Sequence, residues 1–96
     1  MATFISLVSF TDQGIRNVKE SPDRVSAFKA MAEKMGVSTK AVYYTVGHYD
    51  LVTVAEGTDE AVTALLLKLG SLGNVRTETL RAFSVDEMKK IIGSVG

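Results

Sequence analysis

The side chains best suited to chemistry lie in one short segment, Gly47-His48-Tyr49-Asp50. Asp50 has the carboxylate of a general base, and the Tyr49 phenol could hydrogen-bond a ligand at the mouth of a pocket. Histidine exchanges protons near neutral pH, which adds His48 to the candidate site. A structural interpretation competes, because Gly and Asp gather at turns, where an Asp side chain caps exposed backbone amides. In that simpler interpretation His48 is a surface residue at a hairpin tip.

Two more candidates, Arg76 and Gln13, belong to the ends of expected strands. Arg76 and Glu78 project from one face of a strand, because side chains two residues apart share a face. The planar guanidinium of Arg76 suits a carboxylate or phosphate ligand, or else these two residues form ion pairs with a neighbouring strand or subunit. Gln13 follows the first strand and could line the same pocket, although Asp12 and Gln13 could instead cap a helix.

Two adjacent tyrosines, Tyr43 and Tyr44, point to opposite faces of one expected strand. One therefore serves the core under the helices and the other an interface, and each phenol needs a hydrogen-bond partner. The predicted ligand-binding residues are then Gln13, Tyr44, His48, Tyr49, Asp50 and Arg76. No catalytic residue is assigned, because the sequence offers no recognisable pair of nucleophile and base.

The composition argues against a metal or another bound cofactor. The 96 residues include no cysteine and one histidine, which leaves no thiolate or multi-histidine metal site within one chain. Disulfides are excluded for the same reason. We therefore predict no metal and no cofactor.

Charge and length restrict the partners and the compartment. The 11 basic and 11 acidic residues balance, so the chain lacks the basic excess of a nucleic-acid binder and any strong attraction to an anionic membrane. The first residues do not resemble a signal peptide, and no apolar run is long enough to span a bilayer. We expect a cytoplasmic protein with no nucleic-acid or membrane partner, folded as one domain over residues 1–96.

Four strands are expected, and they set the topology. Branched and aromatic residues gather in the segments 4–10, 40–46, 50–56 and 75–83. A helix after the first strand and another after the third give the order β-α-β-β-α-β, which is the ferredoxin-like pattern of an α+β fold. Right-handed crossovers would place both helices on one face of a four-stranded antiparallel sheet.

Capping signals mark the ends of the helices. Ser21 can cap the first long helix, with Pro22 at its first helical position, and Gly36 can end it. Acidic residues open the second helix, where they favour the positive end of the helix dipole. Ser84 and Glu87 form a capping box before an amphipathic C-terminal helix.

Apolar side chains occur on both faces of the expected sheet. Ile5 and Leu7 lie on the opposite face of the first strand from Val8 and Phe10. The helices cover one face, and the other would expose more apolar surface than a monomer tolerates. We therefore expect a homo-oligomer, a dimer or larger, built by packing two sheets face to face. The alternatives are a C-terminal helix folded over this face, or larger rings formed through the strand edges.

Three segments resemble the GYD domain family, which is named for a Gly-Tyr-Asp signature. They are Phe10–Ile15, Gly47–Asp50, with one residue between Gly and Tyr, and Gly70–Thr79. The resemblance implies membership of the dimeric α/β-barrel superfamily, which agrees with an oligomer, but it implies no general activity. Superfamily relatives include cofactor-independent monooxygenases, haem-degrading enzymes and stress-response barrels, and transferring their activities would be analogy at the level of the fold.

Three classes of function fit these residues. The first is a small-molecule-binding or assembly module, with a pocket between sheet and helices for a small, largely apolar molecule. The second is a cofactor-independent enzyme of oxygenase or isomerase type, with a pocket near Tyr49, Asp50 and Arg76. The third is a structural oligomer without a ligand. Whether those three side chains converge on one cavity separates the second class from the others.

Overall fold

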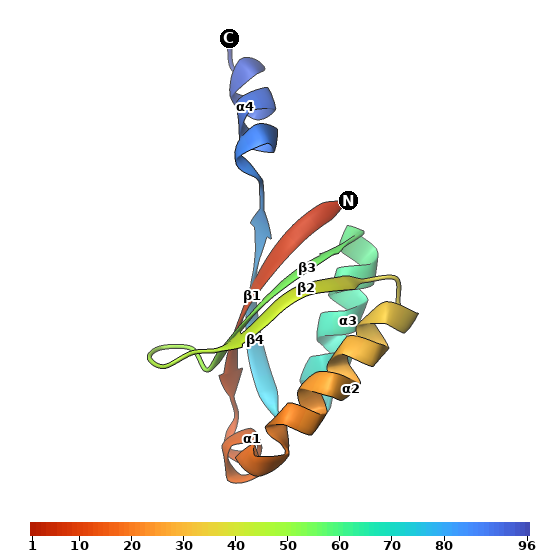
Figure 1. Cartoon of the computed structure of the whole chain (residues 1–96), viewed down its shortest axis with the longest axis vertical. Coiled ribbons are helices and arrows are strands. Elements are labelled where there is room, and N and C mark those ends of the chain that lie inside the picture. The colour runs from red at the N-terminus through yellow and green to blue at the C-terminus, as the bar shows by residue number, and fades with distance from the viewer.

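A computed structural model describes all 96 residues as a four-stranded sheet with two long helices on one side (Figure 1). The elements in chain order are β1 (Ala2–Phe10), α1 (Asp12–Arg16), the 3₁₀ helix η1 (Val18–Glu20), α2 (Ser21–Lys34), β2 (Ser38–Tyr44), β3 (Leu51–Gly57), α3 (Asp59–Ser71), β4 (Val75–Ala82) and α4 (Val85–Gly93). All four predicted strands are present, and so are the three predicted amphipathic helices. The α+β prediction is therefore confirmed.

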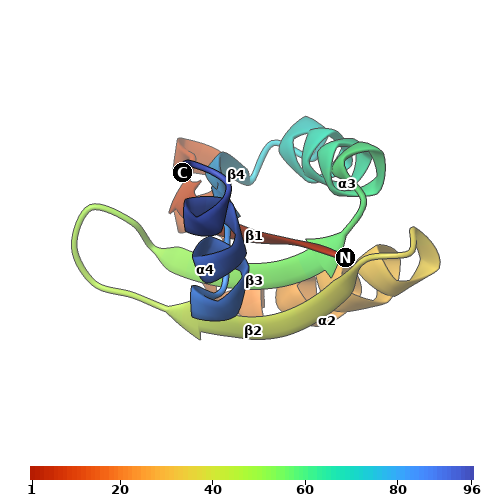
Figure 2. The same cartoon turned by 90° about the horizontal axis from the view of Figure 1, so that it is seen from above.

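The strands pair in the order β2-β3-β1-β4, and every pair is antiparallel. β2 and β3 form a hairpin, whereas α2 and α3 carry the chain across the sheet between strands that are not neighbours. Both of these helices lie on the same face of the sheet (Figures 1 and 2). This arrangement is the ferredoxin-like fold that the element order predicts.

The second strand begins and ends two residues earlier than the predicted range 40–46. Gly36, with a φ of +80°, turns the chain out of α2, and pairing with β3 already starts at Ser38. At the other end, Val46 lies in the hairpin loop and its side chain is fully exposed. The branched residue that extended the prediction therefore belongs to the loop.

Ser21 does not cap α2, so this part of the prediction is wrong. The N-cap residue is Glu20, the last residue of η1, and Pro22 consequently takes the second helical position. The preceding 3₁₀ turn leads directly into the helix. The serine side chain therefore does not cap the helix and can bond elsewhere. Ser21 is buried, and its Oγ shares a 2.8 Å hydrogen bond with the hydroxyl of Tyr44, joining α2 to β2.

The core lies between the helices and the sheet. Its buried apolar side chains are Phe28, Ala32, Val37, Ala55, Val62 and Leu65. Side chains on one face recur every three to four residues in a helix and every two residues in a strand. These side chains therefore form one layer. Leu65 is only 1% exposed, and truncating a leucine buried this completely typically costs about 2–5 kcal/mol.

The other face of the sheet, called the open face below, has no helix over it (Figure 1). Its apolar side chains are Ile5, Leu7, Ala41, Tyr43, Val52, Val54 and Leu80, which the strand register places beside one another. Tyr43 and Leu80 are 64% and 46% exposed. The second apolar face that the sequence predicts is therefore present and uncovered within one chain.

The C-terminal helix α4 lies beyond the end of β4 (Figure 1). The predicted capping box is confirmed: Ser84 Oγ accepts from the Glu87 N–H at 3.0 Å, and the Glu87 carboxylate accepts from the Ser84 N–H at 2.8 Å. The box starts the helix directly after the strand, and the longest dimension of the molecule reaches 51 Å. The alternative in which this helix folds back over its own sheet is therefore wrong.

Candidate functional site

The Asp50 carboxylate is built into the sheet. Its Oδ2 accepts a hydrogen bond from the Phe10 N–H at 2.8 Å, and the Asp50 N–H donates to the Val8 carbonyl at 2.8 Å. Both bonds extend the contact between β1 and β3 beyond Leu51, where regular pairing ends. Asp50 therefore has the backbone-capping geometry that competes with the general-base interpretation.

Tyr49 crosses the end of the open face to reach β4. Its hydroxyl donates to Glu78 Oε2 at 2.5 Å, and Glu78 is the register partner of Leu7 on β1. The hydrogen bond to Glu78 raises the pKa of Tyr49 above its ordinary value of 10.0, because ionisation would break the bond and set two negative charges together. Tyr49 is thus engaged with a surface carboxylate.

His48 lies in the loop between β2 and β3. Gly47 has a φ of +128°, which favours glycine, and it turns the loop immediately before His48. The loop is held by Thr45, whose Oγ1 donates to the Tyr49 carbonyl at 2.6 Å. The His48 side chain is exposed, with its ring centroid 6.2 Å from that of Tyr49. This is the solvent-facing position that the simpler interpretation predicts.

Arg76 and Glu78 share the open face of β4, as the alternation of the strand predicts. Arg76 is exposed and forms no salt bridge within the chain. Glu78 bonds the Tyr49 hydroxyl and pairs with no cation. The ion pairs expected with a neighbouring strand are therefore absent. An ion pair between Arg76 and a neighbouring subunit stays a prediction.

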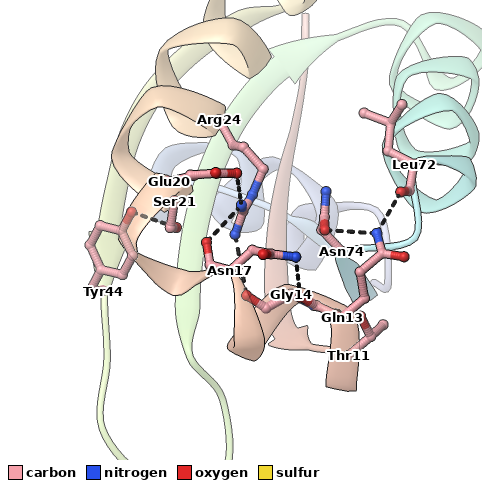
Figure 3. A network of polar contacts seen from close by, with 10 residues as sticks. All are labelled: Thr11, Gln13, Gly14, Asn17, Glu20, Ser21, Arg24, Tyr44, Leu72 and Asn74. Carbon is pink, nitrogen blue, oxygen red and sulfur yellow. Dashed lines mark hydrogen bonds and ion pairs between the residues drawn. The ribbon is translucent and has the colours of Figure 1, made fainter.

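Gln13 fastens α1 to the loop before β4 (Figure 3). Its Nε2 donates to the Leu72 carbonyl at 3.2 Å and to Asn74 Oδ1 at 2.9 Å. The cap of α1 is Thr11, whose Oγ1 accepts from the Gly14 N–H at 3.1 Å. The alternative in which Gln13 caps the helix is therefore wrong, because its side-chain amide binds the loop before β4 instead.

The same loop packs against Gly14 without room for a side chain. Thr11 donates from its backbone N–H to the Asn74 carbonyl at 3.1 Å and from its Oγ1 to the Gly73 carbonyl at 2.6 Å. A Cβ on Gly14 would lie 1.9 Å from the Asn74 carbonyl oxygen. This close approach of two backbones therefore requires glycine at position 14.

Tyr44 lies on the helix-covered face, where its hydroxyl pairs with Ser21 at 2.8 Å. Tyr43 lies on the open face, so the two tyrosines point to opposite faces of the sheet as predicted. Figure 3 shows Tyr44 on one side of the space between α2 and α3, with Gln13 and Asn74 on the other.

A cavity of about 160 Å³ lies between α2, α3 and the sheet, and its walls are mainly apolar. None of the six predicted ligand-binding residues lines it. The structure divides these residues among the β1–β3 pairing, the hairpin loop, the open face, the helix-covered face beside α2 and the end of the sheet near α1. The enzyme hypothesis requires the candidate side chains to converge on one cavity, and they do not.

Sequence reasoning missed the polar residues that do line the cavity. They are Ser6, Ser21, Arg24, Thr53, Asn74 and Thr77. Arg24 could have been found, because it lies three residues after Ser21 and four before Phe28, on the buried side of the helix. The sequence could not identify Thr53 and Thr77 as cavity residues, because threonine is an ordinary strand residue on either face of a sheet.

No group of three or more His, Cys, Asp or Glu side chains is placed to hold a metal ion. None of the helices combines the length and the apolar character needed to cross a bilayer. What the arrangement does offer is a set of hydrogen-bond donors around an apolar cavity, and an apolar sheet face that is uncovered within one chain.

The three segments that carry the family resemblance meet at the end of β1. Asp50 binds Phe10, while Thr11 and Gln13 bind the loop 72–74. A family model described as the GYD domain matches residues 4–92. The match covers most of β1, the whole of the other three strands and nearly the whole of α4.

A curated relative supports the same assignment. It is 38% identical to this chain over 90 residues, which make up 92% of this chain and 95% of the relative. That protein comes from Thermus thermophilus and is named "Glutamine synthetase and cystathionine beta-lyase binding protein". With three motifs joined in space and both sequences matched almost end to end, the chain belongs to the GYD domain family.

Proposed function

We propose that this chain is a homo-oligomeric protein-binding module that attaches to an enzyme through α4. The observation that carries the proposal is the apolar side of α4, which lies in solvent on a helix set apart from the rest of the chain (Figure 1). The relative from Thermus thermophilus is named for binding two enzymes, which supports an enzyme as the class of partner.

The apolar side of α4 has the form of a recognition helix. Its side chains are Val85, Met88, Ile91 and Ile92, and between 40% and 75% of each is exposed; Val95, which is 82% exposed, follows just after the helix. Spacing of three to four residues gathers them on one side of the helix, while Asp86 and Lys90 lie on the other. An amphipathic helix binds a partner by laying such a side into an apolar groove.

The open face is the surface that we assign to a second copy of the chain. Its apolar centre around Ile5 and Val54 is bordered by charges of both signs, with Arg76 and Glu78 two residues apart on β4. Two copies related by a two-fold axis can therefore meet without like-charge repulsion, with Arg76 of one copy approaching Glu78 of the other. Covering this face also removes an apolar area that is unfavourable on a monomer.

The test of protein binding uses the glutamine synthetase and the cystathionine beta-lyase of the organism that encodes this chain. The immobilised full-length chain should bind at least one of them in biolayer interferometry. The double variant Ile91→Lys with Ile92→Lys should weaken this binding at least tenfold, because it places charge on the apolar side of α4. Lys90→Gln, on the opposite side of the same helix, is the matched control and should bind like the wild type.

Three results would contradict the assignment of α4. The first is that neither enzyme binds, and the second is that the double variant binds as tightly as the wild type. The third is that the double variant becomes monomeric while Lys90→Gln does not, which would place α4 in the contact between copies. Circular dichroism spectra equal to that of the wild type show that both variants are folded.

A second function, small-molecule binding, is favoured by the apolar cavity between the helices and the sheet. The enzyme alternative has weaker support, because Tyr49 and Asp50 are bonded to Glu78 and Phe10 and lie outside that cavity. Because the basic and acidic residues balance, we propose neither a nucleic-acid partner nor a membrane partner. We propose the cytoplasm as the compartment.

A further inference from the structure

We infer that the cavity between α2, α3 and the sheet binds a small apolar carboxylate, such as an aromatic or branched-chain acid, whose anionic group is held by Arg24 and Asn74. The inference rests on the small-molecule-binding part of the proposed function and names the ligand class for that site. It does not depend on protein binding through α4.

The size and walls of the cavity determine the apolar part of the ligand. Its volume is about 160 Å³, close to that of an engineered protein cavity of about 150 Å³ that stays dry and takes up benzene. Phe28, Met31 and Leu66 supply aromatic, thioether and branched wall surface from the two helices, and Val8 supplies it from the sheet. A single ring or a short branched chain fits this space.

The one charged residue that lines the cavity is Arg24. Two backbone carbonyls orient its guanidinium: Nη1 donates to Asn17 O at 2.9 Å, and Nη2 donates to Gly14 O at 3.4 Å (Figure 3). Glu20 approaches Nη1 at 3.8 Å, but its side chain is 73% exposed, so water weakens this ion pair. A guanidinium has more N–H donors than these contacts use, and its planar shape matches a carboxylate.

Asn74 supplies a second donor across the mouth of the cavity. Gln13 Nε2 donates to Leu72 O at 3.2 Å and to Asn74 Oδ1 at 2.9 Å. Because a backbone carbonyl only accepts, the contact with Leu72 identifies the Gln13 nitrogen and thereby orients the oxygen of Asn74 toward it. The Nδ2 of Asn74 is left pointing into the space between α2 and α3, as Figure 3 shows.

The chemistry of these two rim groups selects an anion. Arg24 and Asn74 both present N–H donors, one from α2 and the other from the loop before β4. A carboxylate accepts hydrogen bonds from both and carries the charge that complements Arg24. An amine or a neutral hydrocarbon satisfies neither group. The combination of donors at the rim and apolar walls within therefore favours an amphipathic acid.

Two threonines add hydrogen-bonding capacity further along the strands. Ser6 and Ser21 also line the cavity, but the hydroxyl of each is paired within the chain at 2.8 Å. The hydroxyls of Thr53 and Thr77 have no such partner, although they lie among apolar walls. Neither hydroxyl is a fully buried atom without a partner, so each is free to bond an oxygen on the body of the ligand.

The experiment compares 3-phenylpropionate with 3-phenylpropionamide, an uncharged ligand of the same shape. Each is titrated into the full chain and followed by calorimetry and by ¹H–¹⁵N chemical shifts. The acid should bind at least tenfold more tightly than the amide, because only the acid pairs with Arg24. The largest shifts should fall on the amides of Leu66, Asn74 and Thr77, which line the cavity.

Matched variants separate charge recognition from structural damage. Arg24→Gln should weaken binding of the acid at least tenfold and leave binding of the amide unchanged. Arg16→Gln, on exposed α1 and outside the cavity, is the control and should leave both affinities unchanged. Equal losses for both ligands in Arg24→Gln would give Arg24 a purely structural role and overturn the anion site.

The outcomes distinguish this inference from the proposed function. Equal affinity of the wild type for acid and amide would overturn the carboxylate class and leave small-molecule binding in place. No binding of either ligand at millimolar concentration would overturn the inference together with the small-molecule function. Neither result bears on enzyme binding through α4.

Discussion

The Tyr49 hydroxyl donates a 2.5 Å hydrogen bond to the Glu78 carboxylate. The bond joins the loop that precedes β3 to β4, although β1 separates these two strands in the sheet. It places a polar pair beside Leu7, the register partner of Glu78, at one end of the open face. The pair therefore borders the apolar surface that we assign to a second copy of the chain.

The pKa of Tyr49 should fall when Glu78 is replaced by glutamine. Glu78 raises the folded-state pKa above the ordinary value of 10.0, so the stability that the pair provides is present below pH 10 and is lost as the pH rises through the folded-state value. The ¹³C shift of Tyr49 Cζ, followed against pH, reports the midpoint. Equal midpoints in the wild type and Glu78→Gln would show that the bond does not form in solution.

Gly14→Ala should destabilise the chain, whereas Gly70→Ala should not. The new methyl at position 14 would lie 1.9 Å from the Asn74 carbonyl oxygen, while the one at position 70 meets nothing within 4 Å. We expect a loss of about 1–3 kcal/mol for the first and a gain of about 0.5–1 kcal/mol for the second, which removes a helical glycine. Urea unfolding measures both, and equal stabilities would contradict the docking of α1.

Asp50→Ala should lower the free energy of unfolding by about 1–3 kcal/mol, because it leaves the Phe10 N–H without its acceptor. Asp50→Asn keeps a side-chain oxygen and should lose less. Chemical denaturation of the two variants gives the comparison. An alanine variant as stable as the wild type would remove the structural role and restore the case for Asp50 as a general base.

Acid should unwind α4 before the rest of the chain. The hydrogen bond from the Ser84 backbone amide lowers the pKa of the Glu87 carboxyl below its ordinary value of 4.5. Its stabilising effect is therefore present above that value and is lost as the pH falls through the folded-state pKa. The Cα chemical shifts of Met88 and Ile91 should move toward coil values in acid. Glu87→Gln should remove this pH dependence, and helical shifts retained throughout would contradict the prediction.

The fold was predictable because local patterns and global packing agree. Val62 and Leu65 recur at helical spacing and are both buried against the sheet. Ile5 and Val8 alternate along one strand and face the two different sides of the sheet. These periodicities are properties of neighbouring residues, so they can be read without knowing the tertiary contacts.

Capping was less predictable, because a side chain that can cap a helix can also bond elsewhere. Ser84 caps its helix as expected, since Glu87 lies within reach on the same turn. Ser21 has the same hydroxyl but pairs with Tyr44, which lies 23 residues away. The choice between a local and a distant partner depends on packing that the order of residues does not display.

The candidate site was the least predictable part for the same reason. The Asp50 carboxylate accepts a hydrogen bond from Phe10, which is 40 residues away in the sequence. The Gln13 amide donates to residues that are 59 and 61 positions away. Arg24 lies on a helix whose sequence pattern is that of an ordinary amphipathic helix. Only the folded chain brings Arg24 of α2 and Asn74 of the loop before β4 to the same cavity.

We propose that a second copy of the chain covers the open face, and the mass in solution tests this assembly most directly. Sedimentation equilibrium of the full chain at micromolar concentration should give a single species of at least twice the 10.3 kDa of one chain. Val54→Lys, which places a charge at the centre of this face, should shift the mass toward one chain. A wild type that sediments as a uniform 10.3 kDa species would contradict the account.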